Sequence, residues 1–167
     1  RDSSIITSLV AKQMGEQGRR LCTFSVDYTD NEKYFTPTKF QPNADGAYIA
    51  IMQAYLGSRH STTVLTPEDL MGALEDATLA RDLPGMADVD FSLLAFCREI
   101  RRDVKVALSG ECADEIFGGY PWYREADLRD YDGFPWAQTV RERQAFLNDG
   151  VRNNIQTDEF VRERYLH

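Results

Sequence analysis

The fold of this chain is decided by Val104-Lys-Val-Ala-Leu108 and by the residues that follow it, Ser109-Gly-Glu-Cys-Ala-Asp-Glu-Ile-Phe-Gly-Gly-Tyr120. The short β-branched run predicts a buried strand, and Ser109-Gly110 predicts a loop into which that strand opens. Ligands of open parallel α/β sheets gather at the carboxyl ends of strands. We therefore expect a binding loop at Ser109 and Gly110, because glycine lets the backbone approach a ligand closely.

Two carboxylates, Glu111 and Asp114, follow this loop and are three residues apart. If a helix begins near Glu111, both carboxylates lie on one face of its first turn. Such a pair suits Mg²⁺, which is usually held by one or two protein carboxylates together with substrate phosphates. Alternatively, one carboxylate holds the metal while the other accepts a proton. A structural alternative is equally open, because acidic residues commonly cap helices and interact with the helix dipole.

The residues from Ser109 to Tyr120 resemble the signature Ser-Gly-Glu-Gly-Ala/Ser-Asp-Glu-Leu/Val-Phe-Gly-Gly-Tyr of the asparagine synthetase family. This signature belongs to the ATP-using synthetase domain of the family, and a match of such length is more specific than a lone glycine motif. The clear departure is Cys112, where the family usually has glycine. No nearby histidine supplies the usual base for a cysteine nucleophile, so we interpret Cys112 as a small space-filling residue.

Composition describes an ordinary globular protein of 167 residues, with 28% charged residues and a formal net charge of −8. This length is enough for one domain with a substantial core. The negative charge argues against a nucleic-acid surface, which needs clustered lysine and arginine. No apolar run approaches the ~20 residues that span a bilayer, and we expect no signal peptide. The three cysteines lack metal-ligand spacing and favour a reducing, cytoplasmic location.

The rest of the chain predicts strands that alternate with helices, the pattern of a doubly wound, parallel α/β sheet. We expect a helix capped by Asn43 and stopped by Gly57, and another that begins at Thr66. A third helix is expected to be capped by Asp88 or Asp90. The other expected elements are a helix over residues 2–14, strands over 20–27 and 61–65, and helical segments over 136–147 and 157–165.

Arg1-Asp-Ser-Ser4 stands at the start of the first expected helix, where free N–H groups favour anions. From the residues alone, an N-cap is the simpler interpretation. The asparagine synthetase family has a pyrophosphate-binding loop of the form Ser-Gly-Gly-x-Asp-Ser-Ser, and residues 1–4 resemble its last four positions. The resemblance implies an adenine nucleotide alpha hydrolase-like fold, of the N-type ATP pyrophosphatase kind, that lacks its first strand. It also implies a partial domain with a core over about residues 2–123, a helical part over about 124–167, and no glutaminase domain.

Three further positions have two interpretations each. Val26 ends a segment, Thr-Phe-Ser-Val, that resembles the family's adenine-lining strand, so the resemblance implies an adenine contact, and a core valine is the alternative. The resemblance implies that Arg81 and Asp82 help shape an acyl-substrate pocket, and a charge pair at a helix end is the alternative. His60, which precedes an expected strand, is either a neighbour of a ligand or a surface or satisfied histidine.

The resemblance implies that the parent protein uses Mg-ATP to convert a carboxylate, most simply that of aspartate, to an acyl-adenylate with release of pyrophosphate. Ammonia, free or derived from glutamine, then gives the amide and AMP. Magnesium is implied to be held by Asp2 and Asp114, and Glu111 to accept a proton from the ammonia nucleophile. The residues implied to bind ATP and pyrophosphate are Asp2, Ser3, Ser4, Val26, Ser109 and Gly110.

We expect this chain by itself to be weakly active or inactive, because the glycines of the phosphate loop and the strand before them are missing. Two other functions stay open. The chain is a nucleotide-binding module without catalysis, or it belongs to a related adenylating enzyme that forms amides or cyclic amides from another acid. Related lactam-forming cyclases tend to carry tyrosine at the position of Glu111. The glutamate in this chain therefore favours aspartate as the substrate.

Overall fold

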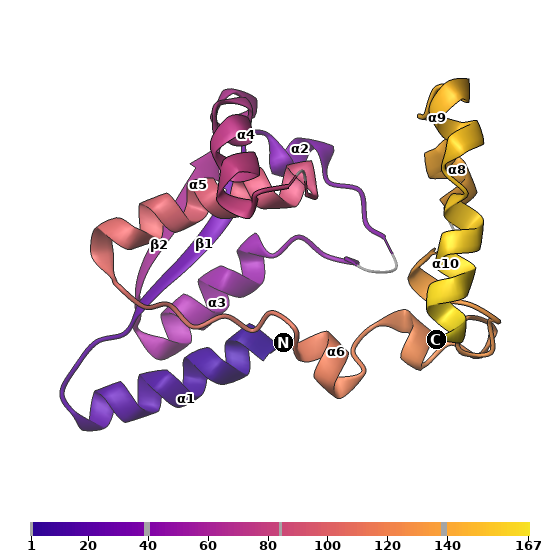
Figure 1. Ribbon diagram of the computed structural model, residues 1–167. Coiled ribbons are helices and arrows are strands. Elements are labelled where there is room, and N and C mark those ends of the chain that lie inside the picture. The colour runs from indigo at the N-terminus through magenta and orange to yellow at the C-terminus, as the bar shows by residue number, and fades with distance from the viewer. Residues whose placement is uncertain (1, 39–40, 84, 138–139) are drawn as a thin grey trace. The chain divides into compact units, whose positions relative to one another are not determined.

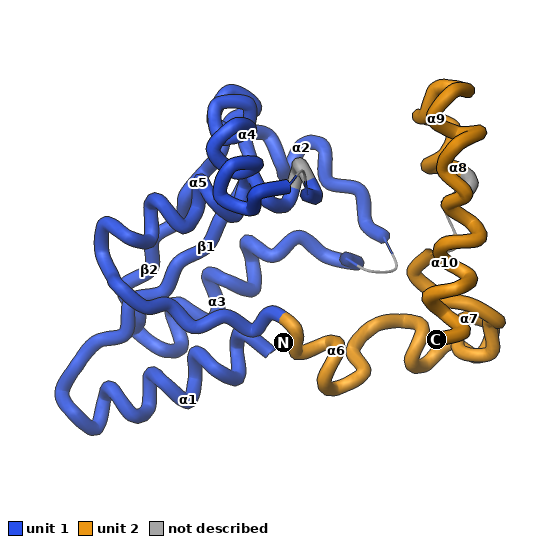
Figure 2. Tube along the Cα trace, viewed as in Figure 1, with its two compact units in different colours: residues 1–111 blue, residues 112–167 orange. Residues whose placement is uncertain are grey.

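The computed structural model describes residues 2–38, 41–83, 85–137 and 140–167 (Figure 1). The chain divides into unit 1, residues 1–111, and unit 2, residues 112–167 (Figure 2). Unit 1 contains a small parallel sheet of two strands, β1 (Cys22–Tyr28) and β2 (Arg59–Leu65). In this sheet Cys22 lies opposite Arg59, and Tyr28 opposite Leu65. The two strands confirm the predicted α/β class, and each begins or ends within about two residues of its expected position.

The helix α3 (Gly46–Leu56) connects the two strands, because parallel neighbours need a crossover. Gly57 ends the helix with a φ of 59°, a left-handed conformation that glycine adopts without steric cost, so the predicted stop is confirmed. The predicted cap at Asn43 is wrong. Asp45, which stands closer to the apolar run, occupies the N-cap position instead.

The helix α1 (Asp2–Glu16) precedes β1, and the short helix α2 (Asn31–Tyr34) follows it. After β2 comes α4 (Pro67–Arg81), which begins with a capping box. The Asp69 N–H donates to Thr66 Oγ1 at 3.1 Å, and the Thr66 N–H donates to Asp69 Oδ2 at 2.9 Å. This second bond lowers the pKa of Asp69. The predicted helix start at Thr66 is therefore confirmed.

The helix α5 (Ala87–Asp103) packs against α4 and also contacts β2. Its N-cap is Met86, so the predicted cap at Asp88 or Asp90 is wrong. Asp90 lies inside the first turn, where its Oδ1 accepts a hydrogen bond of 2.8 Å from Arg81 Nη1. This ion pair ties the end of α4 to the start of α5. Arg81 thus pairs with Asp90 and not with Asp82, which is the C-cap of α4. The side chain of Asp88 lies outside the described ones.

The segment Val104–Leu108 follows α5 and is not a strand, contrary to the prediction. Val104 has extended φ and ψ angles of −137° and 155°. Val106 and Leu108 are 78% and 70% exposed, and no strand pairs with this segment among the residues that the structure describes. The β-branched pattern indicates a preference for extended structure, but a strand also needs hydrogen bonds from a neighbouring strand.

Few large apolar side chains are buried in the described part of unit 1, where the buried apolar residues are Leu65, Ala73 and Ala77. The helices α1 and α3 instead expose apolar residues at helical spacing. These exposed residues are Ile5 and Leu9 on α1, and Tyr48, Ile51 and Tyr55 on α3. Exposed apolar faces of this kind are typical of helices that pack against further structure.

Unit 2 consists of short helices around a chain of aromatic contacts. Trp122 stacks on Tyr120 with ring centroids 4.3 Å apart and contacts Trp136 at 5.6 Å. Phe134 lies 5.0 Å from Trp136 and meets the edge of Tyr165 at 5.4 Å. The elements are α6 (Ala113–Phe117), η1 (Pro121–Tyr123), α7 (Ala126–Arg129), η2 (Pro135–Ala137), α8 (Val140–Gln144), α9 (Asp149–Asn154) and α10 (Thr157–Leu166). No helix in the described ranges of either unit is long and apolar enough to cross a membrane.

Candidate functional site

The loop after Leu108 meets the first turn of α1 at Gly110. A Cβ atom on Gly110 would lie 2.5 Å from the backbone nitrogen of Ser3 and 2.7 Å from Ser3 Oγ. It would also lie 3.0 Å from the carbonyl carbon of Asp2. Only glycine permits this approach, so the glycine of the signature brings the loop against the start of α1. Three of the predicted site residues, Asp2, Ser3 and Gly110, therefore lie together in unit 1.

The first turn of α1 presents backbone N–H groups that have no partner inside the helix. The helix is 15 residues long, so these groups stand at the positive end of a sizeable dipole. Thr7 Oγ1 donates to the carbonyl oxygen of Ser3 at 2.6 Å, and Ser8 Oγ donates to that of Ser4 at 2.8 Å. These bonds hold the side chains of the second turn, while the hydroxyls of Ser3 and Ser4 stay at the helix start. The arrangement suits an anion.

On the other side of this contact, the loop is held by Ser109. The Glu111 N–H donates to Ser109 Oγ at 3.1 Å, which turns the chain at Gly110. Glu111 itself is exposed. Its carboxylate is thus accessible to solvent at the end of unit 1, one residue after Gly110, which contacts α1.

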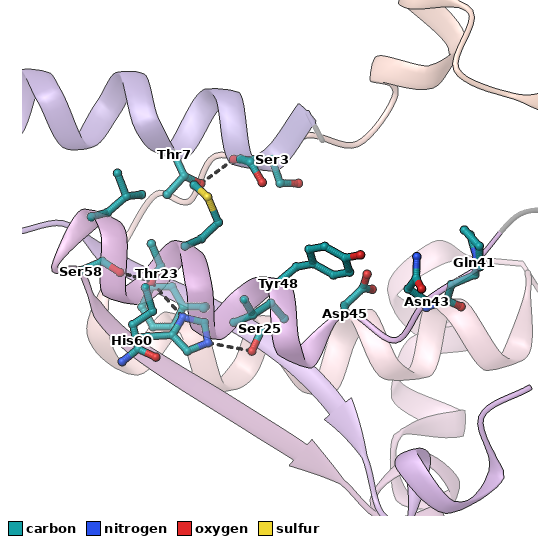
Figure 3. A pocket seen from close by; sticks show the side chains of 17 residues that line it. Ser3, Thr7, Thr23, Ser25, Gln41, Asn43, Asp45, Tyr48, Ser58 and His60 are labelled. Atoms are coloured by element: carbon teal, nitrogen blue, oxygen red, sulfur yellow. Dashed lines mark hydrogen bonds between the residues drawn. The ribbon is translucent and has the colours of Figure 1, made fainter. Parts of the chain in front are cut away.

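A pocket of about 780 Å³ lies beside Ser3 and Ser4 (Figure 3). Its size is within the range of about 300–1,000 Å³ that is common for small-molecule sites. The pocket is lined by the start of α1, by α3 along its length with the segment before it, and by residues of the sheet. The polar side chains around it are Ser3, Ser4, Thr7, Thr23, Ser25, Gln41, Asn43, Asp45, Tyr48, Gln53, Ser58 and His60.

His60 lies in β2 at the base of this pocket, between two hydroxyls of β1 (Figure 3). Its Nδ1 is 2.9 Å from Thr23 Oγ1, and its Nε2 is 2.9 Å from Ser25 Oγ. Burial lowers the pKa of His60, since the charged ring is less well solvated there. Both ring nitrogens have partners, so of the two interpretations that the sequence leaves open, the structure agrees with the satisfied histidine.

The backbone of Val26 points to the edge of β1 that faces away from β2. Two bonds define the pairing: the Arg59 N–H donates to the carbonyl of Leu21 at 2.8 Å, and the Thr29 N–H donates to that of Leu65 at 3.0 Å. Backbone groups of successive strand residues point to alternate sides, so the N–H and C=O groups of the odd-numbered residues of β1 point toward β2. The N–H and C=O of Val26 therefore face the other edge, which is the orientation that a backbone contact to a ligand requires.

Asp114 belongs to unit 2, in the first turn of α6. Its carboxylate lies over Gly119, where a Cβ atom would overlap Asp114 Oδ1. The Gly119 N–H donates to the backbone carbonyl of Asp114 at 2.9 Å, and Arg124 Nη2 donates to the carbonyl of Gly119 at 2.7 Å. Nearby, the Tyr120 hydroxyl donates to Glu115 Oε1 at 3.0 Å, and this bond raises the pKa of Tyr120.

The expected placement of Glu111 and Asp114 on one helix face is wrong. The helix α6 begins at Ala113, and Glu111 precedes it. The reason is Cys112, whose φ of 66° is left-handed and therefore interrupts any helix that continues from Glu111. Left-handed backbone also gives a physical reason why glycine is the usual residue at this position of the resembled signature.

Replacing Cys112 with glycine is expected to stabilise the protein by about 0.5–1 kcal/mol. The left-handed conformation costs a residue with a side chain about 1–2 kcal/mol, and the greater freedom of glycine in the unfolded chain offsets part of the gain. Urea denaturation of the natural protein that contains this chain would measure the change in unfolding free energy. Cys97→Ala, at an exposed helical position, is the matched control for loss of a thiol. Destabilisation by Cys112→Gly would contradict the strain argument.

The magnesium ligands predicted from the sequence, Asp2 and Asp114, lie in different units, so their pairing stays a prediction. Within the described ranges, no group of three or more histidine, cysteine, aspartate or glutamate side chains could hold a metal ion. Mg²⁺ often takes only one or two protein carboxylates and completes its shell with phosphate and water. Carboxylates at Asp2 and Asp114 therefore fit the donor chemistry of Mg²⁺ bound together with a nucleotide.

Sequence reasoning missed the hydroxyl-rich face of the sheet as part of the pocket. Thr23 and Ser25 alternate with Cys22, Phe24 and Val26 in a strand that was expected to be buried. Polar residues at every second position of such a strand indicate that one of its faces is polar. This signal is present in the sequence, but its partner His60 stands 37 residues from Thr23 and is joined to it only by the strand pairing.

The described fold is of the α/β class, with a glycine of the signature loop packed against a serine-bearing helix start. Comparison with known proteins identifies the family: the chain belongs to the asparagine synthase family, which matches residues 2–167. It is 48% identical to glutamine-hydrolysing asparagine synthetase 3 of Bacillus subtilis over 165 residues, 98% of this chain and 26% of that protein. A putative asparagine synthetase of Mycobacterium tuberculosis is 41% identical over 81 residues, 48% of this chain and 12% of that protein. Asparagine synthetase 1 of Bacillus subtilis is 33% identical over 135 residues, 80% of this chain and 19% of that protein.

The chain thus spans about a quarter of the length of the first of these relatives, at 26%. The family signature predicted from residues 109–120 is confirmed by this membership. All three of these relatives are named as asparagine synthetases, and the matched part of each is a fraction of a longer protein.

Proposed function

We propose that the natural protein containing this chain is a ligase that converts aspartate to asparagine. In this proposal Mg-ATP adenylates the side-chain carboxylate of aspartate, which releases pyrophosphate, and ammonia attacks the β-aspartyl-AMP to give asparagine and AMP. The observation that carries the proposal is the close contact of Gly110 with Ser3 at the start of α1, in a chain 48% identical to a named asparagine synthetase.

The first turn of α1 binds the pyrophosphate part of ATP in this proposal. Its free N–H groups and the hydroxyls of Ser3 and Ser4 donate to phosphate oxygens. Gly110 lets the signature loop approach this turn closely. Ser109 and Gly110 contact the nucleotide through the loop backbone. The N–H and C=O of Val26, which face the open edge of β1, bond to the adenine ring.

In this proposal Asp2 and Asp114 hold Mg²⁺, and the charge of Mg²⁺ neutralises the pyrophosphate leaving group. Glu111 accepts a proton from the ammonia nitrogen after it has added to the acyl carbon. The exposure of Glu111 is compatible with this role, because the ammonia must reach it. Arg81 is engaged with Asp90, so any effect of Arg81 on the acyl-substrate pocket acts through the junction of α4 and α5.

The sheet in this proposal is of the adenine nucleotide alpha hydrolase-like kind, with a further strand before α1. α1 and α3 line the same pocket on the face of the sheet that carries Thr23 and Ser25. Because strand–helix–strand crossovers are right-handed, helices on one face advance in one direction across the sheet. A strand before α1 therefore lies at the edge of β1 away from β2 and pairs with the part of β1 that precedes Val26, so the N–H and C=O of Val26 stay free for the nucleotide. Since Gly110 contacts Asp2 and Ser3, the segment Val104–Leu108 lies beside that strand and pairs with it.

Ammonia is derived from glutamine in a glutaminase domain elsewhere in the natural protein. The relatives that match this chain are named as glutamine-hydrolysing, and the chain matches only a part of each. We propose a cytoplasmic location because Cys22, Cys97 and Cys112 are all free thiols. The chain by itself is expected to be weakly active or inactive, because its exposed apolar faces lack the structure that covers them.

The test is ATP–pyrophosphate exchange by the natural protein, with aspartate as the variable substrate. We expect exchange that requires both Mg²⁺ and aspartate, and that is absent when glutamate replaces aspartate. Mg-ATP binding without exchange would overturn adenylation and support a nucleotide-binding module. Exchange with a different carboxylic acid, but not with aspartate, would instead support a related adenylating enzyme.

A further inference from the structure

We propose that His60 is a positioning residue for the nucleotide. Its Nε2–H holds the hydroxyl of Ser25 and thereby fixes the peptide group that presents the Val26 N–H to the open edge of β1. The inference rests on the proposed function and deepens it, because it assigns part of the nucleotide affinity to a residue that does not touch the nucleotide.

The hydrogen bonds around His60 assign the proton of its ring. Ser25 Oγ donates to Thr62 Oγ1 at 3.1 Å, and a hydroxyl has only one proton to donate. Ser25 Oγ must therefore accept from His60 Nε2, at 2.9 Å, so Nε2 carries the proton. In the neutral ring Nδ1 then accepts from Thr23 Oγ1, which in turn accepts from Ser58 Oγ at 3.1 Å. Each side chain therefore donates to the next in the order Ser58, Thr23, His60, Ser25, Thr62.

This network is anchored inside the sheet. Ser58 is buried, and burial lowers the pKa of His60, so the ring is neutral at pH 7 with one donor and one acceptor. Thr23 and Ser25 belong to β1, whereas Ser58 immediately precedes β2, and His60 and Thr62 lie within it. The imidazole therefore bridges two hydroxyls of β1 from the neighbouring strand, at the base of the pocket beside Ser3 and Ser4 (Figure 3).

The bond to Ser25 matters more for Val26 than the bond to Thr23 does. The peptide group between Ser25 and Val26 is planar, so its orientation is set at the Cα of Ser25. The C=O of Ser25 faces β2 and the N–H of Val26 faces the open edge, as the strand pairing requires. Holding the Ser25 side chain against the ring therefore limits the rotation of the N–H that the nucleobase would meet. Thr23 is three residues from Val26 and has no such link.

Replacing His60 with glutamine or with asparagine tests its two hydrogen bonds one at a time. The glutamine amide reaches the position of Nε2 and can still donate to Ser25, whereas the asparagine amide reaches only the position of Nδ1. In the natural protein, we expect His60→Gln to keep the KM for ATP within about threefold of the unaltered value. We expect His60→Asn to raise it about tenfold, the loss that corresponds to one hydrogen bond. The kcat and the KM for aspartate should change little in both variants.

Ser25→Ala and Thr23→Ala test the same assignment from the other side. Ser25→Ala should raise the KM for ATP as His60→Asn does, and Thr23→Ala should raise it less. Nitrogen NMR of the His60 ring should show the proton on Nε2. Equal shifts in KM for His60→Gln and His60→Asn, or a ring protonated on Nδ1, would show that His60 only packs within the sheet.

The proposed function and the inference about His60 can fail independently of each other. If the unaltered protein exchanges no pyrophosphate with aspartate, the proposed function fails, but equilibrium binding of Mg-ATP to the same four variants still tests His60. If aspartate-dependent exchange occurs and the His60 variants do not differ in nucleotide affinity, the inference about His60 fails while the proposed function stands.

Discussion

Asp114→Asn is expected to lower the rate of aspartate-dependent ATP–pyrophosphate exchange in the natural protein by about a thousandfold. Asparagine has nearly the same shape as aspartate, so the side chain can still lie over Gly119, but it lacks the negative charge that would bind Mg²⁺ in the proposed function. A metal ion that neutralises a phosphate leaving group supplies several kcal/mol, and about 4 kcal/mol corresponds to a thousandfold in rate. Raising the Mg²⁺ concentration should restore part of the rate, because the remaining ligand still binds weakly.

Asp127→Asn is the matched control for this change. Asp127 stands in the first turn of α7 as Asp114 stands in that of α6, and it is exposed in the same unit. The control should keep exchange within about twofold, since surface charges away from a site have small effects. If Asp114→Asn retained a tenth or more of the rate with an unchanged Mg²⁺ requirement, Asp114 would not be a metal ligand.

The elements that could be predicted from the sequence are those whose signals are local. The helix start at Thr66 depends on a hydroxyl, a proline and an aspartate within four residues, and the structure contains the complete capping box. Gly57 ends α3 because the conformation there suits glycine. The strand β1 has enough β-branched and aromatic residues to be predicted within two residues of its bounds.

The elements that could not be predicted depend on residues elsewhere. Val104–Leu108 has the composition of a strand, but pairing requires a neighbour that the pattern does not describe. The helix α6 begins two residues later than expected because Cys112 is left-handed, and cysteine is not a residue that signals this conformation. Residue type predicts Asp88 or Asp90 as the cap of α5, whereas the N-cap is Met86 and Asp90 interacts with Arg81 on another helix.

The candidate site shows the same division between local and non-local signals. The glycine after Ser109 follows from its residue type, whereas the serines at the start of α1 follow from the resemblance to the family's phosphate loop. The structure places Ser3 against Gly110. The bonds of His60 could not be predicted, because they depend on a strand register that places Thr23 opposite His60. A register of this kind is a long-range property, and a shift by one residue would turn the hydroxyls to the other face.

Gly110→Ala is expected to reduce aspartate-dependent exchange by about a hundredfold, with most of the loss in affinity for Mg-ATP. The new Cβ atom would lie 2.5 Å from the backbone nitrogen of Ser3, and real Cβ atoms do not approach backbone so closely. Either the loop or the first turn of α1 must move, and a displacement of about 1 Å in a positioned site costs about a hundredfold. Gly72→Ala is the control, because a Cβ atom on Gly72 meets nothing within 4 Å in the middle of α4. It should leave exchange unchanged and stabilise the helix by about 0.5–1 kcal/mol. Normal Mg-ATP affinity in Gly110→Ala would mean that the contact between this loop and α1 is not part of the nucleotide site.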